Sequence, residues 1–223
     1  MQTSPLTLSF LEARVVAVLF EKQRTVPDTY PLTLNSLVAG CNQKTSRAPV
    51  IEASAAEVQA ALDSLKAMSL AIESSGGRAM RYEHNLTRVL KIPEQSAALL
   101  AVLMLRGPQT AGELRIASER LHAFADISSV EAFLEELANR PAGGLVRLLP
   151  RQPGERESRW GHLLCGEPAV EAPGSDGRPT FAHPSAEASL VARVESLEAE
   201  LAVLKQRLAR VCEKLGVDPQ LLE

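Results

Sequence analysis

Residues 54–65, with the sequence SAAEVQAALDSL, combine a helix start with one apolar helix face. Ser54 and Glu57 match the capping box, in which each side chain accepts a hydrogen bond from the other residue's backbone N–H. The apolar residues follow the pattern Val-x-x-Ala-Leu-x-x-Leu, which is the spacing of a buried helix face. Residues 128–137, with the sequence SSVEAFLEEL, repeat this pattern with Phe in place of Ala. The repeat predicts two related units in the chain.

The segments that precede these two helices also correspond. Residues 18–25 (VLFEKQRT) and 103–110 (LMLRGPQT) each end an apolar helix and enter a turn. A short helix is predicted next in each copy, around residues 34–38 and 111–117. Four helix starts carry a capping box: Ser9/Glu12, Ser54/Glu57, Thr110/Glu113 and Ser128/Glu131.

Two short strands are predicted after each long helix. In the first copy, the Gly-rich turn 74–78 joins strands at 70–73 and 80–84. In the second copy, residues 150–157 join strands at 145–149 and 158–163. Three helices followed by an antiparallel hairpin is the winged-helix order. The sequence therefore predicts a mainly α fold with small β wings. Its two tandem winged-helix domains are expected over residues 1–88 and 89–165.

The segment that follows the second copy changes in character. Residues 166–186 contain four prolines and three glycines without periodicity, which predicts a disordered linker. A coiled coil is predicted over residues 187–216, followed by a short tail at 217–223. Apolar residues alternate there in steps of four and three, at Leu190, Val194, Leu197, Leu201, Leu204, Leu208, Val211 and Leu215.

These eight apolar residues predict a parallel homodimer. In a parallel pair, Arg193 would face Glu198 of the second chain, and Glu200 would face Lys205, so both contacts join opposite charges. Two alternatives stay open. The helix could fold back on its own domain, or three chains could associate, because no polar residue inside the seam fixes the oligomeric state.

Charge and composition limit the classes of function. The 223-residue chain has a net charge of −3, and its excess of acid lies in residues 166–223, so the whole chain lacks the basic character typical of nucleic-acid binding. The three cysteines are far apart, which predicts no disulfide framework. We expect a cytoplasmic protein, because the start of the chain lacks the basic region of a signal peptide and the longest apolar run is short.

Catalytic motifs are absent from the sequence. The four histidines are isolated from one another, and no Cys-x-x-Cys pair, phosphate-binding loop or nucleophile elbow occurs. We therefore expect no enzymatic activity, no metal ion and no cofactor.

Polar and cationic residues in three loops are the candidate contacts for DNA or for a protein partner. Asn, Gln and Arg side chains can hydrogen-bond base edges or phosphates. The candidates are Asn42, Gln43, Lys44 and Arg47 in the first loop, Arg78 and Arg81 in the first hairpin, and Arg147, Arg151, Arg156 and Arg159 in the second hairpin. Each loop has a structural alternative: the first could only satisfy turn backbone, and Glu155 and Glu157 weaken the charge of the second hairpin.

Several stretches resemble the YceH-like family of bacterial proteins, which has no established biochemical activity. They are residues 26–37 (VPDTYPLTLNSL), 41–50 (CNQKTSRAPV), 106–115 (RGPQTAGELR), 121–126 (LHAFAD) and 150–157 (PRQPGERE). The resemblance implies a tandem winged-helix fold and brings no catalytic residues. The family often has an acid at the position of Ala48, so Ala48 is given no contact role.

Two functions remain open from the sequence. Winged helices usually bind DNA through the third helix and the wing, which favours a dimeric DNA-associated transcriptional regulator that uses its loop and wing cations. The outward residues of both third helices are rich in carboxylates, which phosphates repel. This acidity argues against insertion of either third helix into a DNA groove. That acidity favours the second hypothesis, a protein–protein adaptor or scaffold.

Overall fold

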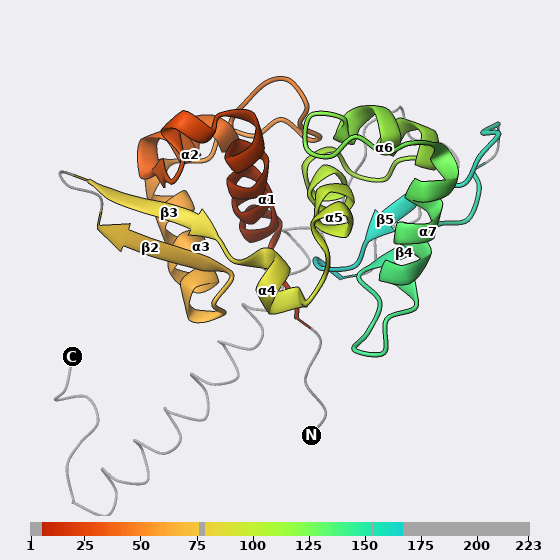
Figure 1. Cartoon of the computed structure of the whole chain (residues 1–223). Coiled ribbons are helices and arrows are strands. Elements are labelled where there is room, and N and C mark those ends of the chain that lie inside the picture. Colours follow the sequence, from red (N-terminus) through yellow and green to blue (C-terminus); the bar gives the residue numbers. More distant parts are fainter. Residues whose placement is uncertain (1–5, 76–78, 153, 167–223) are drawn as a thin grey trace, which may run out of the picture. The chain divides into compact units, whose positions relative to one another are not determined.

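The computed structural model describes residues 6–75, 79–152 and 154–166. This part of the chain is mainly helical with small antiparallel sheets, as predicted, and three helices followed by a hairpin occur twice along it (Figure 1). The first half contains α1 (Phe10–Thr25), the 3₁₀ turn η1 (Pro27–Thr29), β1 (Leu32–Thr33), α2 (Leu34–Cys41), α3 (Ala55–Ala67), β2 (Ala71–Ser75), β3 (Met80–His84) and α4 (Leu86–Leu90). The second half contains α5 (Glu94–Arg106), α6 (Ala111–Ser118), α7 (Ile127–Ala138), β4 (Val146–Leu148) and β5 (Trp160–His162).

Three of the four predicted capping boxes are confirmed, at the starts of α1, α3 and α6. The prediction for α7 is wrong. Asp126 caps this helix, because its carboxylate accepts a hydrogen bond from the backbone N–H of Ser129 at 2.7 Å. Asp is as good an N-cap as Ser, so the helix begins at Ile127 and Ser128 lies inside its first turn.

The first sheet has the strand order β1–β3–β2 and is antiparallel throughout. Strand β3 has the predicted bounds, whereas β2 extends two residues further than predicted, to Ser75. Strand β1 was not predicted, because a strand of two residues is too short to show an alternation of apolar and polar residues. It forms by pairing Leu32 with Tyr82 of β3. The strands of the second hairpin are confirmed in position but are shorter than predicted.

Helices α1 and α5 form the centre of the described fold. Eight consecutive residues of α1, Ala13 to Phe20, and ten of α5, Ser96 to Leu105, are buried. A helix that is buried on every side must lie in a core. The two helices pack on each other between the remaining elements of the two halves (Figure 1), and one continuous hydrophobic core runs through both halves.

The boundary predicted between residues 88 and 89 falls within α4, which was not predicted. The predicted linker beyond Gly166, the coiled coil with its eight apolar residues and the C-terminal tail lie outside the described residues. None of the helices in the described ranges is long and apolar enough to cross a membrane.

Candidate binding surface

The loop between α2 and α3 is closed by one side chain. The Nδ2 of Asn42 donates to the carbonyl oxygen of Ala53 at 2.8 Å, and the backbone N–H of Ala53 donates back to Oδ1 at 2.8 Å. Asn42 therefore holds the two ends of the loop together and satisfies backbone groups, which is the structural alternative considered for it. The nitrogen and the oxygen of its side-chain amide are both engaged in these two hydrogen bonds.

Arg47 points into the protein from the same loop. Its guanidinium donates to both carboxylate oxygens of Glu21, at 3.1 and 2.6 Å, and to the carbonyl of Gly40 from Nε at 3.1 Å. The side chain of Arg47 is completely buried. Burial disfavours the charge of Glu21, but the hydrogen bonds and charge of Arg47 outweigh this, so the pKa of Glu21 lies below its ordinary value. Arg47 is thus a structural residue in this conformation.

Arg14 fixes the far end of the loop and was not singled out from the sequence. It lies completely buried in α1, where Nη2 donates to the carbonyl of Pro49 at 2.9 Å and Nη1 to that of Cys41 at 3.3 Å. Burial, and then the neighbouring charge of Arg47, lower its pKa to about 10. The one signal for it in the sequence is a cation placed within the apolar face of a helix.

These contacts leave the tip of the loop to solvent. Lys44 and Thr45 are exposed. The carboxyl-terminal end of α5 supports the loop, because Arg106 donates to the Oγ of Ser46 at 2.8 Å and the N–H of Ala48 donates to the carbonyl of Leu105 at 2.9 Å. Gln43 accepts a hydrogen bond from Lys22 at 3.0 Å, so Lys44 is the candidate in this loop that faces outward.

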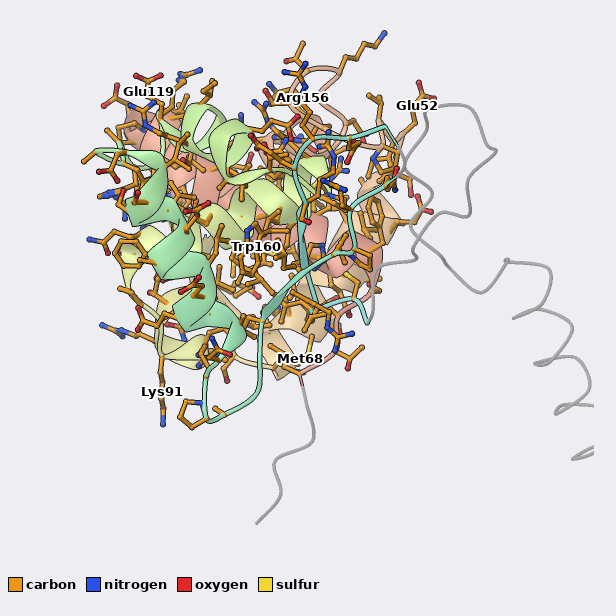
Figure 2. All side chains as sticks on the ribbon, turned by 90° about the vertical axis from the view of Figure 1, so that its right-hand side faces the viewer. Glu52, Met68, Lys91, Glu119, Arg156 and Trp160 are labelled. Atoms are coloured by element: carbon orange, nitrogen blue, oxygen red, sulfur yellow. The ribbon has the colours of Figure 1, made fainter. Side chains whose placement is uncertain are left out.

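In the two hairpins, as in the loop, some cations bind groups of the fold and others are exposed. Arg81 donates to the carbonyl of Pro31 at 2.7 Å. Arg159 pairs with Glu155 at 2.9 Å and Glu113 at 2.7 Å. Three cations are exposed on the second hairpin, Arg147, Arg151 and Arg156, and Arg156 is labelled in Figure 2. Arg78 lies outside the described residues.

The exposed charged side chains of α3 and α7 are carboxylates, as the sequence predicted. Glu57 and Asp63 are exposed on α3, and Glu131, Glu135 and Glu136 are exposed on α7. Their negative charge is unfavourable beside DNA phosphates.

Two exposed isoleucines were not singled out from the sequence. Ile116 on α6 is 72% exposed, and Ile127 at the start of α7 is 47% exposed. A Cβ built on Gly112, one turn before Ile116, would lie 3.9 Å from the Cδ1 of Ile127, so α6 and α7 lie close together near their first turns. The sequence pattern assigned helices here but could not show that these two apolar residues would be exposed.

His84, the last residue of β3, has a partly buried imidazole that packs against α1. Its ring centroid lies 5.0 Å from that of Phe20, and its Nε2 is 2.8 Å from the Oε1 of Gln23. Burial, and then the charge of Arg24, lower the pKa of His84 to about 4. Within the described ranges, no group of His, Cys, Asp or Glu side chains is suited to hold a metal ion.

This pKa predicts a loss of stability in mild acid. A histidine in an unfolded chain titrates near about pH 6.5, so between that pH and about 4 the unfolded state binds more protons than the folded state. The stability due to neutral His84 is therefore complete above about pH 6.5 and decreases as the pH falls to about 4, by about 3 kcal/mol. Urea denaturation at a series of pH values measures this slope. The variant His84→Gln should have a shallower slope, and identical slopes in the two proteins would contradict the assignment.

The fold and surface are those of a mainly helical protein with two helix–hairpin units. The family model described as a protein of unknown function, DUF480, matches residues 8–155, and the chain belongs to this family. A UPF0502 protein of Acidovorax sp. (strain JS42) is 55% identical over 219 residues, which cover 97% of this chain and 96% of the relative. A UPF0502 protein of Dechloromonas aromatica (strain RCB) is 61% identical over 201 residues, which cover 90% and 94%. The resemblance inferred from the sequence is thereby confirmed.

Proposed function

We propose that this chain is a non-enzymatic cytoplasmic adaptor that binds a protein partner. In this proposal each helix–hairpin unit is a winged-helix module: α1–α3 with β2 and β3, and α5–α7 with β4 and β5. The helix order and the antiparallel hairpins support this assignment. The observation that carries the adaptor function is the exposure of two large apolar side chains on the second unit, Ile116 at 72% and Ile127 at 47%.

The charged residues support a protein partner over DNA. Arg47, Arg81 and Arg159 all donate to groups within the fold, so they have fewer donors to offer to phosphates. DNA affinity depends strongly on the number of phosphates that a protein neutralises. The acidic outward faces of α3 and α7 oppose the usual docking of a third helix in the major groove.

A DNA-associated regulator is the second candidate function, and one observation favours it. Arg151 and Arg156 are exposed on the second hairpin, while the neighbouring Glu155 is paired with Arg159. The acid that weakened this cationic surface in the sequence is therefore partly neutralised. Together with Lys44, these residues could contact a few phosphates in each chain.

Fluorescence anisotropy with random-sequence duplex DNA at about 50 and about 200 mM salt distinguishes the two functions. For an adaptor we expect no binding at micromolar protein at either salt concentration. Binding that weakens steeply with salt and is lost in Arg151→Gln/Arg156→Gln would establish the regulator instead. The matched control Arg88→Gln/Lys91→Asn removes two exposed cations from α4 and its end. Equal loss in both variants would mean unspecific attraction, with no role for the second hairpin.

We also propose that two chains pair through the heptad residues between Leu190 and Leu215. Opposite charges at the flanking positions support a parallel pair. In analytical ultracentrifugation, the full chain is expected to sediment as a dimer and a chain cut after Pro184 as a monomer. A dimer of the shortened chain would place the interface elsewhere, and a full-length trimer would support the three-chain alternative.

A further inference from the structure

The loop between α2 and α3 is held in one shape by contacts along its length. Asn42 and Ala53 exchange two hydrogen bonds at its base, and the buried side chain of Arg47 anchors its middle. The N–H of Ala48 donates to the carbonyl of Leu105 at the end of α5. The exposed residues between these contacts form the loop tip, which we define as Lys44, Thr45 and Ser46. A surface whose shape is already fixed loses little conformational freedom when it binds a ligand.

Hydrogen-bond donors at the loop tip are not used by the fold. Within the described residues, the backbone N–H groups of Lys44, Thr45 and Ser46 have no acceptor. Ser46 has a φ of 58°, in the left-handed region, and the chain bends at all three residues. Successive N–H groups in turns with such a residue form concavities that bind anions. The loop tip therefore offers the backbone donors of an anion site.

Two cations accompany these donors. Arg106, at the end of α5, donates from Nη2 to the Oγ of Ser46 at 2.8 Å. Lys44 lies two residues before Ser46, so their Cα atoms are at most about 7 Å apart, which a lysine side chain spans. In the part of the chain that the structure describes, neither Lys44 nor Arg106 forms an ion pair. Glu21, the acid that the loop contacts, already carries two ion pairs, and Glu52, the one acid within the loop, lies next to its base. The charges of the two cations are therefore available to a ligand.

From this arrangement we propose that the loop tip and Arg106 bind the phosphate group of a phosphorylated serine or threonine in a partner protein. Such a phosphomonoester has three acceptor oxygens and a charge of about −2 at neutral pH. Arg106 and Lys44 balance this charge, and the N–H and hydroxyl groups of the loop tip donate to the oxygens. This inference rests on the proposed adaptor function and names the chemistry of its partner.

The surroundings of the loop tip favour a protein side chain as the source of the phosphate. A free metabolite is usually enclosed by a pocket that buries most of its surface, whereas the three residues of the loop tip are exposed. DNA carries one charge on each phosphate, and its affinity depends on contacts with many phosphates. The exposed carboxylates Glu57 and Asp63 of α3, the helix that follows the loop, oppose such an extended contact. A single dianionic group needs only the local site.

An NMR titration of the isotope-labelled full chain tests the proposal. The probe is phosphoserine blocked at both termini, added at about pH 7.5, where its phosphate is a dianion. Blocked serine is the matched control, because it differs only by the phosphate. We expect the amide signals of the loop tip to shift and saturate with blocked phosphoserine and to stay in place with blocked serine. Dimethyl phosphate, which has the single charge of a DNA phosphate, should bind about tenfold more weakly, a difference of about 1.4 kcal/mol.

Variants link the shifts to the two cations. Lys44→Gln and Arg106→Gln should each raise the dissociation constant of blocked phosphoserine by about tenfold. The side chain of Lys44 forms no hydrogen bond or ion pair with the described residues, so weaker binding in Lys44→Gln is not explained by an altered loop. The matched variant Arg88→Gln, which removes an exposed cation from α4, should leave the dissociation constant unchanged.

The other outcomes overturn the proposal. Absence of shifts at the loop tip, equal binding of dimethyl phosphate, or equal weakening in Arg88→Gln would each exclude a phosphomonoester site there. Inorganic phosphate that binds more than about tenfold tighter than blocked phosphoserine would identify a site for a free anion instead. The adaptor function would survive these results, because the exposed isoleucines carry it. Salt-sensitive binding of duplex DNA that is lost in Lys44→Gln would reject both.

Discussion

Replacement of Arg47 by Ala is expected to lower the free energy of unfolding by about 3 kcal/mol. The substitution leaves the largely buried carboxylate of Glu21 without its bidentate partner and removes two donors from the carbonyl of Gly40. An uncompensated charge in a poorly solvated position is strongly destabilising. Urea denaturation at neutral pH measures the difference.

Lys44→Ala is the matched control for Arg47→Ala, since both substitutions remove a cation from the same loop. Lys44 is exposed, so its removal should change stability by no more than about 0.5 kcal/mol. The double variant Glu21→Gln/Arg47→Met should recover part of the loss, because it removes both charges together. If Arg47→Ala were as stable as Lys44→Ala, Arg47 would not hold the fold together, and a role in binding a partner would regain support.

Leu100→Ala in α5 is expected to destabilise both halves of the described chain together, by about 3 kcal/mol. Leu100 is fully buried in the hydrophobic core, which runs through both halves by way of α1 and α5. The lost contacts and the cavity that remains both contribute to this cost. Because the core is continuous, the halves should unfold in one cooperative transition rather than as two separate modules.

Native-state hydrogen exchange distinguishes these two possibilities. The amides of α3 in the first half and of α7 in the second half should lose protection in parallel in Leu100→Ala. Met80→Ala, at an exposed position of β3, is the control and should change neither. Loss of protection in α7 alone would show that the halves are energetically independent despite their shared core.

The sequence predicted those features of the fold that depend on neighbouring residues. Capping boxes join residues three apart, so Ser9, Ser54 and Thr110 identified their helix starts directly. Start signals that overlap are harder to rank, and the choice of Ser128 over Asp126 was wrong for that reason. Short elements such as β1 and α4 were missed because their stability comes from distant contacts, for example the pairing of Leu32 with Tyr82.

The candidate surface depended much more on tertiary structure. By sequence alone, Lys44 and Arg47 are equivalent cations three residues apart in a polar loop. The fold directs one to solvent and buries the other against Glu21, which is 26 residues away. The exposure of Ile116 and Ile127 was likewise decided by which residues of α6 and α7 are buried in the core. The sequence by itself determined where helices and hairpins form, because their signals are local. Only the tertiary structure decided which polar and apolar side chains remain for a partner, because burial depends on contacts between distant segments.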